Sequence, residues 1–183
     1  MTIRYSYPPD FAYEDKPSLW QNPRELNFLL RWFSSNEVQT ILEIGIGYGH
    51  FGKILNSHYY TVVGIDRIKP KTVGLNKAYK HIIIGNSTLQ ETIEKAREYA
   101  PYDVVFIDGN HSESVVALDF DNYSGMAKKA VIFHDIAGNR NGKFKTPLGV
   151  KNFWRSIKKV FPTIEMNDEE PYNYGIGIIE IRR

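Results

Sequence analysis

The stretch from Thr40 to Asp66 limits most strongly how this chain can fold. It reads TILEIGIGYGHFGKILNSHYYTVVGID. A short apolar run suits a buried parallel strand, and three glycines at positions 45, 47 and 49 follow it. Apolar residues then recur at helical spacing before a second apolar run ends at Asp66. This order of strand, glycine turn, helix, strand and acid predicts one right-handed βαβ unit.

The glycine turn and Asp66 together favour a ligand that contains a ribose. Glycines let the backbone approach a ligand closely, and the start of the following helix offers unpaired N–H groups. An acid at the tip of the second strand can accept hydrogen bonds from a ribose. The dinucleotide pattern GxGxxG needs a third glycine at position 50, where this chain has His50. The turn therefore suits a ligand with an amino-acid tail and no pyrophosphate, and the alternative is a tight turn without a ligand.

The pattern Glu43-x-Gly45-x-Gly47-x-Gly49 resembles the first motif of class I S-adenosylmethionine (SAM)-dependent methyltransferases. The resemblance implies that the motif binds the amino-acid part of SAM and that Asp66 binds its ribose. The end of the third strand often contacts the adenine in these enzymes. Here that strand end carries Asn86 and Ser87, which we expect at the adenine. Ser87 with Gln90 also forms a capping box, so capping a helix is the alternative role of Ser87.

Length and composition exclude several classes of protein. A length of 183 residues fits a single domain, 1–183, in which residues 1–37 form an N-terminal arm and a helix. The chain has no cysteine, which excludes disulfides, thiol nucleophiles and thiolate metal sites. No apolar run reaches the roughly 18–20 residues of a membrane span, and the N-terminus lacks the apolar core of a signal peptide. We therefore expect a cytoplasmic protein without a membrane partner.

The rest of the chain continues the alternation of strands and helices. Apolar runs predict further strands at 81–85, 102–108, 129–133, 163–166 and 175–181. The helix between the fourth and fifth strands carries Asp119 on the same face as Val116, Phe120 and Tyr123. The predicted fold class is α/β: a Rossmann-like, doubly wound, mostly parallel seven-stranded sheet with an antiparallel last strand, in three α/β/α layers. Functional groups are expected where the parallel strands end.

Polar side chains follow the fourth and fifth strands of this predicted sheet. Asp108 ends the fourth strand, His111 lies just beyond it, and His134 and Asp135 end the fifth. Because parallel strands end at one edge, these groups can converge, and Asp108, His134 and Asp135 could hold a divalent ion. Oxygen ligands suit magnesium or calcium, while an imidazole shifts the choice towards manganese, iron or zinc. The alternative is that Asp108 holds the cofactor or a backbone amide and His134 is a buried, hydrogen-bonded histidine.

The runs VVFIDGNHSESVVALDF, VIFHDI and GVKNFW resemble one branch of the methyltransferases. That branch contains the sugar and macrolide O-methyltransferases and the cephalosporin-hydroxylase-like proteins. The resemblance implies that Asp108 and Asp135 bind a divalent cation, magnesium or manganese, and that His111 is the general base. His134 departs from the pattern, because the branch more often has two acids at this pair. The implied activity is SAM-dependent O-methylation of a small hydroxylated acceptor, resembling a sugar or a natural product, with Asp108 and His111 as catalytic residues.

Three alternative functions remain at this stage, together with the expectation of a possible homodimer. A nicotinamide-dependent oxidoreductase is disfavoured by the missing glycine, and a non-catalytic SAM-binding accessory protein would share the motifs. A shared acceptor site in a homodimer would suit a short chain. An RNA methyltransferase would use the basic residues that follow the fourth βα unit, although a net charge of +2 disfavours nucleic acid as a partner. Those residues are Lys128, Lys129, Lys143, Lys145, Lys151, Arg155, Lys158 and Lys159.

Overall fold

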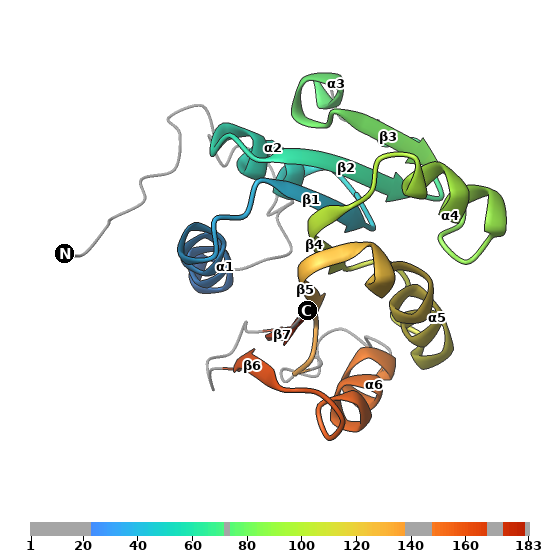
Figure 1. Cartoon of the computed structure of the whole chain (residues 1–183). Coiled ribbons are helices and arrows are strands. Elements are labelled where there is room, and N and C mark those ends of the chain that lie inside the picture. The colour runs from blue at the N-terminus through green and yellow to red at the C-terminus, as the bar shows by residue number, and fades with distance from the viewer. Residues whose placement is uncertain (1–22, 72–73, 138–147, 168–173, 182–183) are drawn as a thin grey trace.

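The computed structural model describes residues 23–71, 74–137, 148–167 and 174–181. A seven-stranded sheet crosses the molecule in the order β3-β2-β1-β4-β5-β7-β6 (Figure 1). Five of its strands are parallel, and β7 pairs antiparallel with both β5 and β6. The strands are β1 (Thr40–Ile44), β2 (Thr61–Asp66), β3 (His81–Ile84), β4 (Tyr102–Ile107), β5 (Ala127–His134), β6 (Thr163–Met166) and β7 (Ile176–Glu180).

The strand order reverses between β1 and β4. From β1 the chain moves outward through β2 to β3, and then it crosses back and moves the other way through β4 to β5. β1 and β4 pair in parallel with Ile44 opposite Ile107, so the two strands end side by side. In open α/β sheets a crevice for a ligand forms at this reversal, outside the carboxyl ends of the strands.

Helices cover both faces of the sheet, so the predicted three layers are present. One apolar cluster includes Leu29 of α1, Ile54 of α2 and Leu75 of α3. The opposite cluster includes Ile93 of α4, Phe120 of α5 and Trp154 of α6. The helices are α1 (Pro23–Ser35), α2 (His50–Ser57), α3 (Leu75–Ala78), α4 (Gln90–Arg97), α5 (Glu113–Tyr123), the 3-10 helix η1 (Ser124–Met126) and α6 (Gly149–Ile157).

One local prediction is wrong. The sequence predicts that Ser87 caps a helix through a capping box with Gln90, but α4 starts only at Gln90 and Leu89 precedes it as the cap residue. The reason is a turn made by Asn86, whose Oδ1 accepts hydrogen bonds from the Thr88 backbone N–H at 3.2 Å and the Thr88 hydroxyl at 3.1 Å. Because of this turn the helix begins only at Gln90, and the Ser87 side chain does not cap it.

Residues 1–22 of the predicted N-terminal arm lie outside the described residues, as do residues 138–147, a stretch rich in Gly, Asn and Lys. Within the described part, none of the helices is long and apolar enough to cross a membrane.

Candidate functional site

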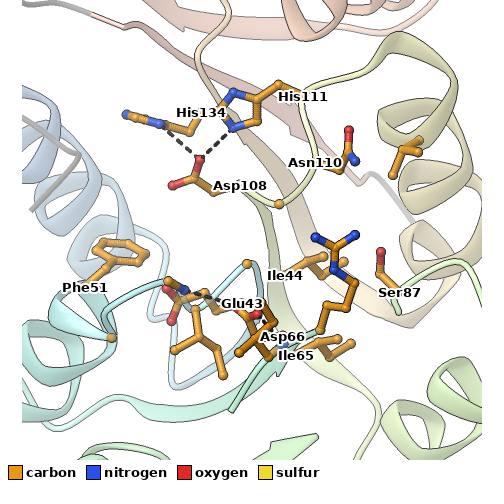
Figure 2. Close-up of a pocket in the computed structure, with 18 of the residues that line it drawn as sticks. Glu43, Ile44, Phe51, Ile65, Asp66, Ser87, Asp108, Asn110, His111 and His134 are labelled. Atoms are coloured by element: carbon orange, nitrogen blue, oxygen red, sulfur yellow. Dashed lines mark hydrogen bonds and ion pairs between the residues drawn. The ribbon is translucent and has the colours of Figure 1, made fainter. Parts of the chain in front are cut away.

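A cavity of about 570 Å³ opens at the carboxyl edge of the sheet, where the strand order reverses. Its walls come from the ends of β1 to β5 and from Tyr174. Figure 2 shows Glu43, Asp66 and Ser87 on one side and Asp108, His111 and His134 on the other. The cavity brings together every residue that the sequence nominates for the site, which are Glu43, Gly45, Gly47, Gly49, Asp66, Asn86, Ser87, Asp108, His111, His134 and Asp135.

The glycine turn has two different reasons for its glycines. Gly45 has φ +97°, and a Cβ there would lie 2.2 Å from the carbonyl oxygen of Asp108. Only glycine therefore lets the turn pack against the end of β4. Gly47 has φ +54°, and a Cβ on it would meet no described atom within 4 Å. The backbone at Gly47 thus faces open space in the cavity, which leaves room for a ligand to approach it closely.

Asp66 ties the glycine turn to the end of β2. Its Oδ2 accepts the Gly47 backbone N–H at 2.9 Å, and its Oδ1 accepts the Ile68 backbone N–H at 2.9 Å. A carboxylate has about four lone-pair positions, so each oxygen can accept a further hydrogen bond. Asp66 can therefore hold the turn and still accept hydrogen bonds from ribose hydroxyls.

Glu43 is buried and has a partner that sequence reasoning missed. The Tyr79 hydroxyl donates a hydrogen bond to Glu43 Oε2 at 2.7 Å. Burial raises the pKa of Glu43 well above its usual value, the Tyr79 hydrogen bond partly opposes this, and the charges of Asp108 and Asp66 add to it. A ligand cation next to Glu43 would reverse this shift and ionise the carboxyl group.

A signal for Tyr79 exists in the sequence, although it is indirect. A Cβ on Gly52 of α2 would lie 2.2 Å from the Tyr79 hydroxyl oxygen, and a Cβ on Gly64 of β2 would lie 2.8 Å from its ring. These two glycines make room for the tyrosine. They stand in a helix and a strand, where glycine is otherwise unfavourable.

Two histidines and two aspartates meet at the ends of β4 and β5, and Figure 2 shows three of them, His111, His134 and Asp108. His134 Nδ1 lies 3.3 Å from Asp108 Oδ1 and 3.2 Å from Asp135 Oδ2. His111 Nε2 lies 3.6 Å from Asp108 Oδ1 and 3.3 Å from Asp135 Oδ2. Each carboxylate therefore faces both imidazoles.

The charges of this cluster compensate one another. Burial opposes ionisation of Asp108, but the charge of His134 and hydrogen bonds from both histidines lower the pKa of Asp108 to about 2. Burial also disfavours a charged His134, yet Asp108 and Asp135 raise its pKa well above the usual value. The pKa of His111 is raised too, because Asp108 and Asp135 outweigh burial and the repulsion from His134. The arrangement favours carboxylates and imidazolium groups together.

Glu25 of α1 is a second residue that the sequence did not nominate. Its buried Oε1 accepts the backbone N–H groups of Tyr174 at 2.8 Å and Gly175 at 2.7 Å. Its Oε2 lies 3.4 Å from His134 Nε2, so both ring nitrogens of His134 face carboxylates. Because this contact joins positions far apart in sequence, no local spacing could indicate it. Glu25 holds the His134 ring in place from behind the cavity.

The donor atoms that could surround a cation belong to Asp108, His111 and Asp135. One ligand atom from each lies within 4.8 Å of the others. His134 has a side chain only 1% exposed, and its nitrogens already face Asp108, Asp135 and Glu25. Asp135 has φ +65°, an uncommon backbone conformation for a residue other than glycine that often marks functional sites. The geometry thus groups His111 with the two aspartates as candidate ligands, while the buried His134 contacts the same carboxylates.

Solved O-methyltransferases share this fold at low sequence identity. An O-methyltransferase from Bacillus cereus in complex with SAH matches with a TM-score of 0.66 and 16% identity over 88% of this chain and 82% of its own. TomG from Streptomyces achromogenes, in complex with SAM, matches with a TM-score of 0.65 and 15% identity over 87% and 80%. These likenesses confirm the predicted Rossmann-like methyltransferase fold.

A third similar structure contains a metal ion. MycE from the mycinamycin biosynthetic pathway, in complex with Mg, SAH and mycinamycin VI, matches with a TM-score of 0.57 and 17% identity. The match covers 84% of this chain and 48% of MycE, so the chain spans about half the length of that protein. No protein-family model and no curated protein matches the sequence.

Proposed function

We propose that this protein is a SAM-dependent O-methyltransferase that acts on a small hydroxylated acceptor. The observation that carries the proposal is one cavity whose walls combine an open glycine turn, a ribose-type acid and a histidine–aspartate cluster. The first two features suit SAM, and the third suits removal of a proton from an acceptor. The complexes of similar enzymes with SAH and SAM support the same reading.

Residues at one end of the cavity would bind SAM, and residues at the other end would remove the proton of the acceptor. Glu43 and the Gly47 backbone would hold the amino-acid part of SAM, and Asp66 its ribose. SAM supplies an electrophilic methyl group on a sulfonium sulfur. His111 Nε2 would accept the proton of the acceptor hydroxyl, which lies in line with that methyl group. Because the pKa of His111 is raised, this base role requires a pH above the raised value, so the rate should increase with pH.

The same cluster fits a divalent cation, magnesium or manganese. Two carboxylates and one imidazole offer oxygen and nitrogen ligands, and the absence of cysteine disfavours a structural zinc site. A bound ion would lower the pKa of the acceptor hydroxyl. Asp108 and Asp135 would then be ligands, as the sequence suggests, with His111 as the third and His134 behind them. A His111 that ligates the ion cannot also be the base, so metal dependence decides between its two roles.

Contacts within the chain weigh against RNA as the acceptor. Lys128 pairs with Asp103 at 2.8 Å, Lys158 pairs with Glu165 at 2.7 Å, and Lys129 donates to the backbone carbonyls of Asn36 and Glu37. Three of the basic side chains that could bind phosphate therefore already have partners. The nicotinamide alternative lacks the third glycine of its motif.

Isothermal titration calorimetry with S-adenosylhomocysteine and with NAD tests the cofactor. We expect binding of S-adenosylhomocysteine and none of NAD; binding of NAD alone would contradict the proposal. A screen of small hydroxylated compounds with SAM labelled in its methyl group then tests turnover. A protein that binds SAM but labels no member of a broad set of acceptors would support the accessory-protein alternative.

A further inference from the structure

A buried carboxylate lies behind the wall of the cavity at Ser87. Asp119 of α5 is fully buried, and neither of its carboxylate oxygens has a hydrogen-bond partner among the described residues. Its surroundings raise the pKa of Asp119 to about 6, mainly through burial, while the Ser87 hydroxyl group lowers it. The helix spacing independently places Asp119 near Ser87, because Asp119 lies one turn before Tyr123, whose hydroxyl contacts Ser87; the Ser87 and Asp119 side chains are not hydrogen-bonded to each other.

The same helix also holds the backbone of Ser87. Tyr123, one turn after Asp119, donates its hydroxyl proton to the carbonyl oxygen of Ser87 at 2.8 Å. Helix α5 thus contacts Ser87 through Tyr123, and Asp119 lies on the same buried face one turn earlier. Ser87 in turn lines the cavity, whereas Asp119 and Tyr123 do not. Any effect of Asp119 on a ligand would pass through Ser87.

Ser87 carries one of the two hydroxyl groups with which this loop lines the cavity; the other belongs to Thr88. The neighbouring Asn86 was expected to accept a hydrogen bond from an amino group of the ligand. Its Oδ1 already accepts two hydrogen bonds from Thr88, so Asn86 offers the cavity mainly its donor NH2 group. The side-chain acceptors that this loop can offer are then two hydroxyl groups: Thr88, whose proton already goes to Asn86 Oδ1, and Ser87, which becomes an acceptor when its own proton goes to Asp119.

We propose that Asp119 is a positioning residue that makes the Ser87 hydroxyl an acceptor for the exocyclic amino group of adenine. The inference rests on the proposed function, because it assumes that the adenine of SAM lies beside Ser87. A serine hydroxyl has one proton to donate and two lone pairs. An ionised carboxylate can only accept, so a Ser87 side chain rotated towards Asp119 gives its proton to Asp119 and turns its lone pairs to the cavity.

This arrangement selects the chemical class of the purine. A 6-amino purine presents a donor to the Ser87 lone pair and forms a hydrogen bond. A 6-oxo purine presents an acceptor, which would face another acceptor and lose the bond. Sites that are built around one hydrogen bond discriminate well against analogues that lack the partner. The ionised form of Asp119 needed here predominates at pH 7.5, above a pKa of about 6.

The test compares the dissociation constants of S-adenosylhomocysteine and S-inosylhomocysteine, its 6-oxo analogue, by calorimetry at pH 7.5. We expect the wild type to prefer the adenosyl compound at least tenfold. Asp119→Asn keeps the shape of the side chain but can donate to Ser87 Oγ, which frees the Ser87 proton for the ligand. The ratio of the two dissociation constants should then fall to about one, or the protein should prefer S-inosylhomocysteine. Asp121→Asn, on the exposed side of the same helix, should keep the preference.

Each outcome decides the proposal. A purely structural role of Asp119 would weaken both ligands equally and leave their ratio unchanged, which would overturn the inference. Ser87→Ala, a change in the wall of the cavity, should also abolish the preference, and it decides the question if Asp119→Asn does not fold. Equal binding of both compounds by the wild type would refute the inference while the proposed function stands. A wild type that binds neither compound would refute the proposed function itself.

Discussion

Glu43 lies in β1 and Asp108 directly follows the neighbouring strand β4, yet the pKa values of their carboxyl groups shift in opposite directions. Both residues line the same cavity, and the strands that carry them pair directly. The pKa of Glu43 is raised well above its usual value, whereas that of Asp108 is lowered to about 2. Burial acts in the same direction on both. The difference comes from their partners, which are a neutral tyrosine hydroxyl for Glu43 and two imidazoles for Asp108.

This difference indicates what each end of the cavity can do. Within the described residues no positively charged side chain pairs with Glu43, and an ammonium group of a ligand would supply that charge. The Asp108 end is already compensated by histidines, so it can move or hold a proton without needing a ligand's charge. We therefore assign cofactor binding to the first end and acceptor chemistry to the second.

The largest effect should come from the Asp108 end. His111→Ala and Asp108→Asn should each lower the rate of methyl transfer by about 10²–10⁴-fold, because each change removes a group that either accepts the proton of the acceptor, positions the base or binds the cation. His111→Ala should still bind S-adenosylhomocysteine, because His111 lies at the acceptor side. A rate assay with labelled SAM, combined with calorimetry, measures both quantities.

His81→Ala is the matched control for these variants. His81 stacks on Tyr99 at the edge strand β3 and does not line the cavity, so its loss should leave the rate unchanged. Unchanged rates in both His111→Ala and Asp108→Asn would reject the assigned chemistry at this end.

Metal removal should have the next largest effect. Exhaustive EDTA treatment followed by gel filtration should abolish most of the activity, and added magnesium or manganese should restore it. The reason is that Asp108, His111 and Asp135 group their donor atoms within 4.8 Å of one another. Full activity in EDTA would mean that the imidazolium of His134 supplies the compensating charge, and His111 would keep its role as the base.

The sequence predicted the strands of this sheet and the edge where the site lies, because both depend on local patterns. Apolar runs mark buried strands, and polar residues at their ends must converge once the strands are parallel. Asp108, His111 and Asp135 follow from this rule. Asp119 was placed on the correct helix face, but its neighbour Ser87 was not foreseen.

The partners of the buried acids could not be predicted in this way. Glu25 contacts Tyr174, Gly175 and His134, and Tyr79 contacts Glu43, across long stretches of chain. Such contacts depend on how α1 and the C-terminal end of α3, where Tyr79 lies, pack against the sheet. No periodicity or spacing in one sequence encodes that packing.

A smaller effect should follow from the loss of the Glu43 partner. Tyr79→Phe removes the hydroxyl that donates to Glu43, so it leaves a buried carboxyl without that hydrogen bond. S-adenosylhomocysteine should bind about tenfold more weakly, since one hydrogen bond to a charged group contributes roughly that much. Tyr59→Phe, which alters a side chain that is 96% exposed, serves as the control. An unchanged dissociation constant in Tyr79→Phe would show that Tyr79 does not contribute to binding of the cofactor.

The smallest effect is on the pH dependence of stability, and it tests the opening comparison most directly. A carboxyl group whose pKa is raised on folding favours the folded state below its unfolded pKa of about 4.5. That stabilisation is lost as the pH rises through the raised folded value, at about 1.4 kcal/mol for each unit of the shift. Glu43→Gln should therefore gain stability relative to the wild type as the pH rises, measured by urea unfolding between pH 4 and pH 9.

The matched control for this measurement is Glu91→Gln, which changes an exposed acid of α4 and should follow the wild type at every pH. The contribution of Asp108 to stability depends on pH in the opposite sense. Because the pKa of Asp108 is lowered on folding, its ionised form stabilises the folded state above about pH 3.8, and this stabilisation is lost only as the pH falls towards about 2. Its titration therefore lies below the measured range and cannot produce the predicted loss. A Glu43→Gln curve parallel to that of the wild type would mean that Glu43 is ionised in the folded protein, and the two ends of the cavity would then not differ in charge as argued here.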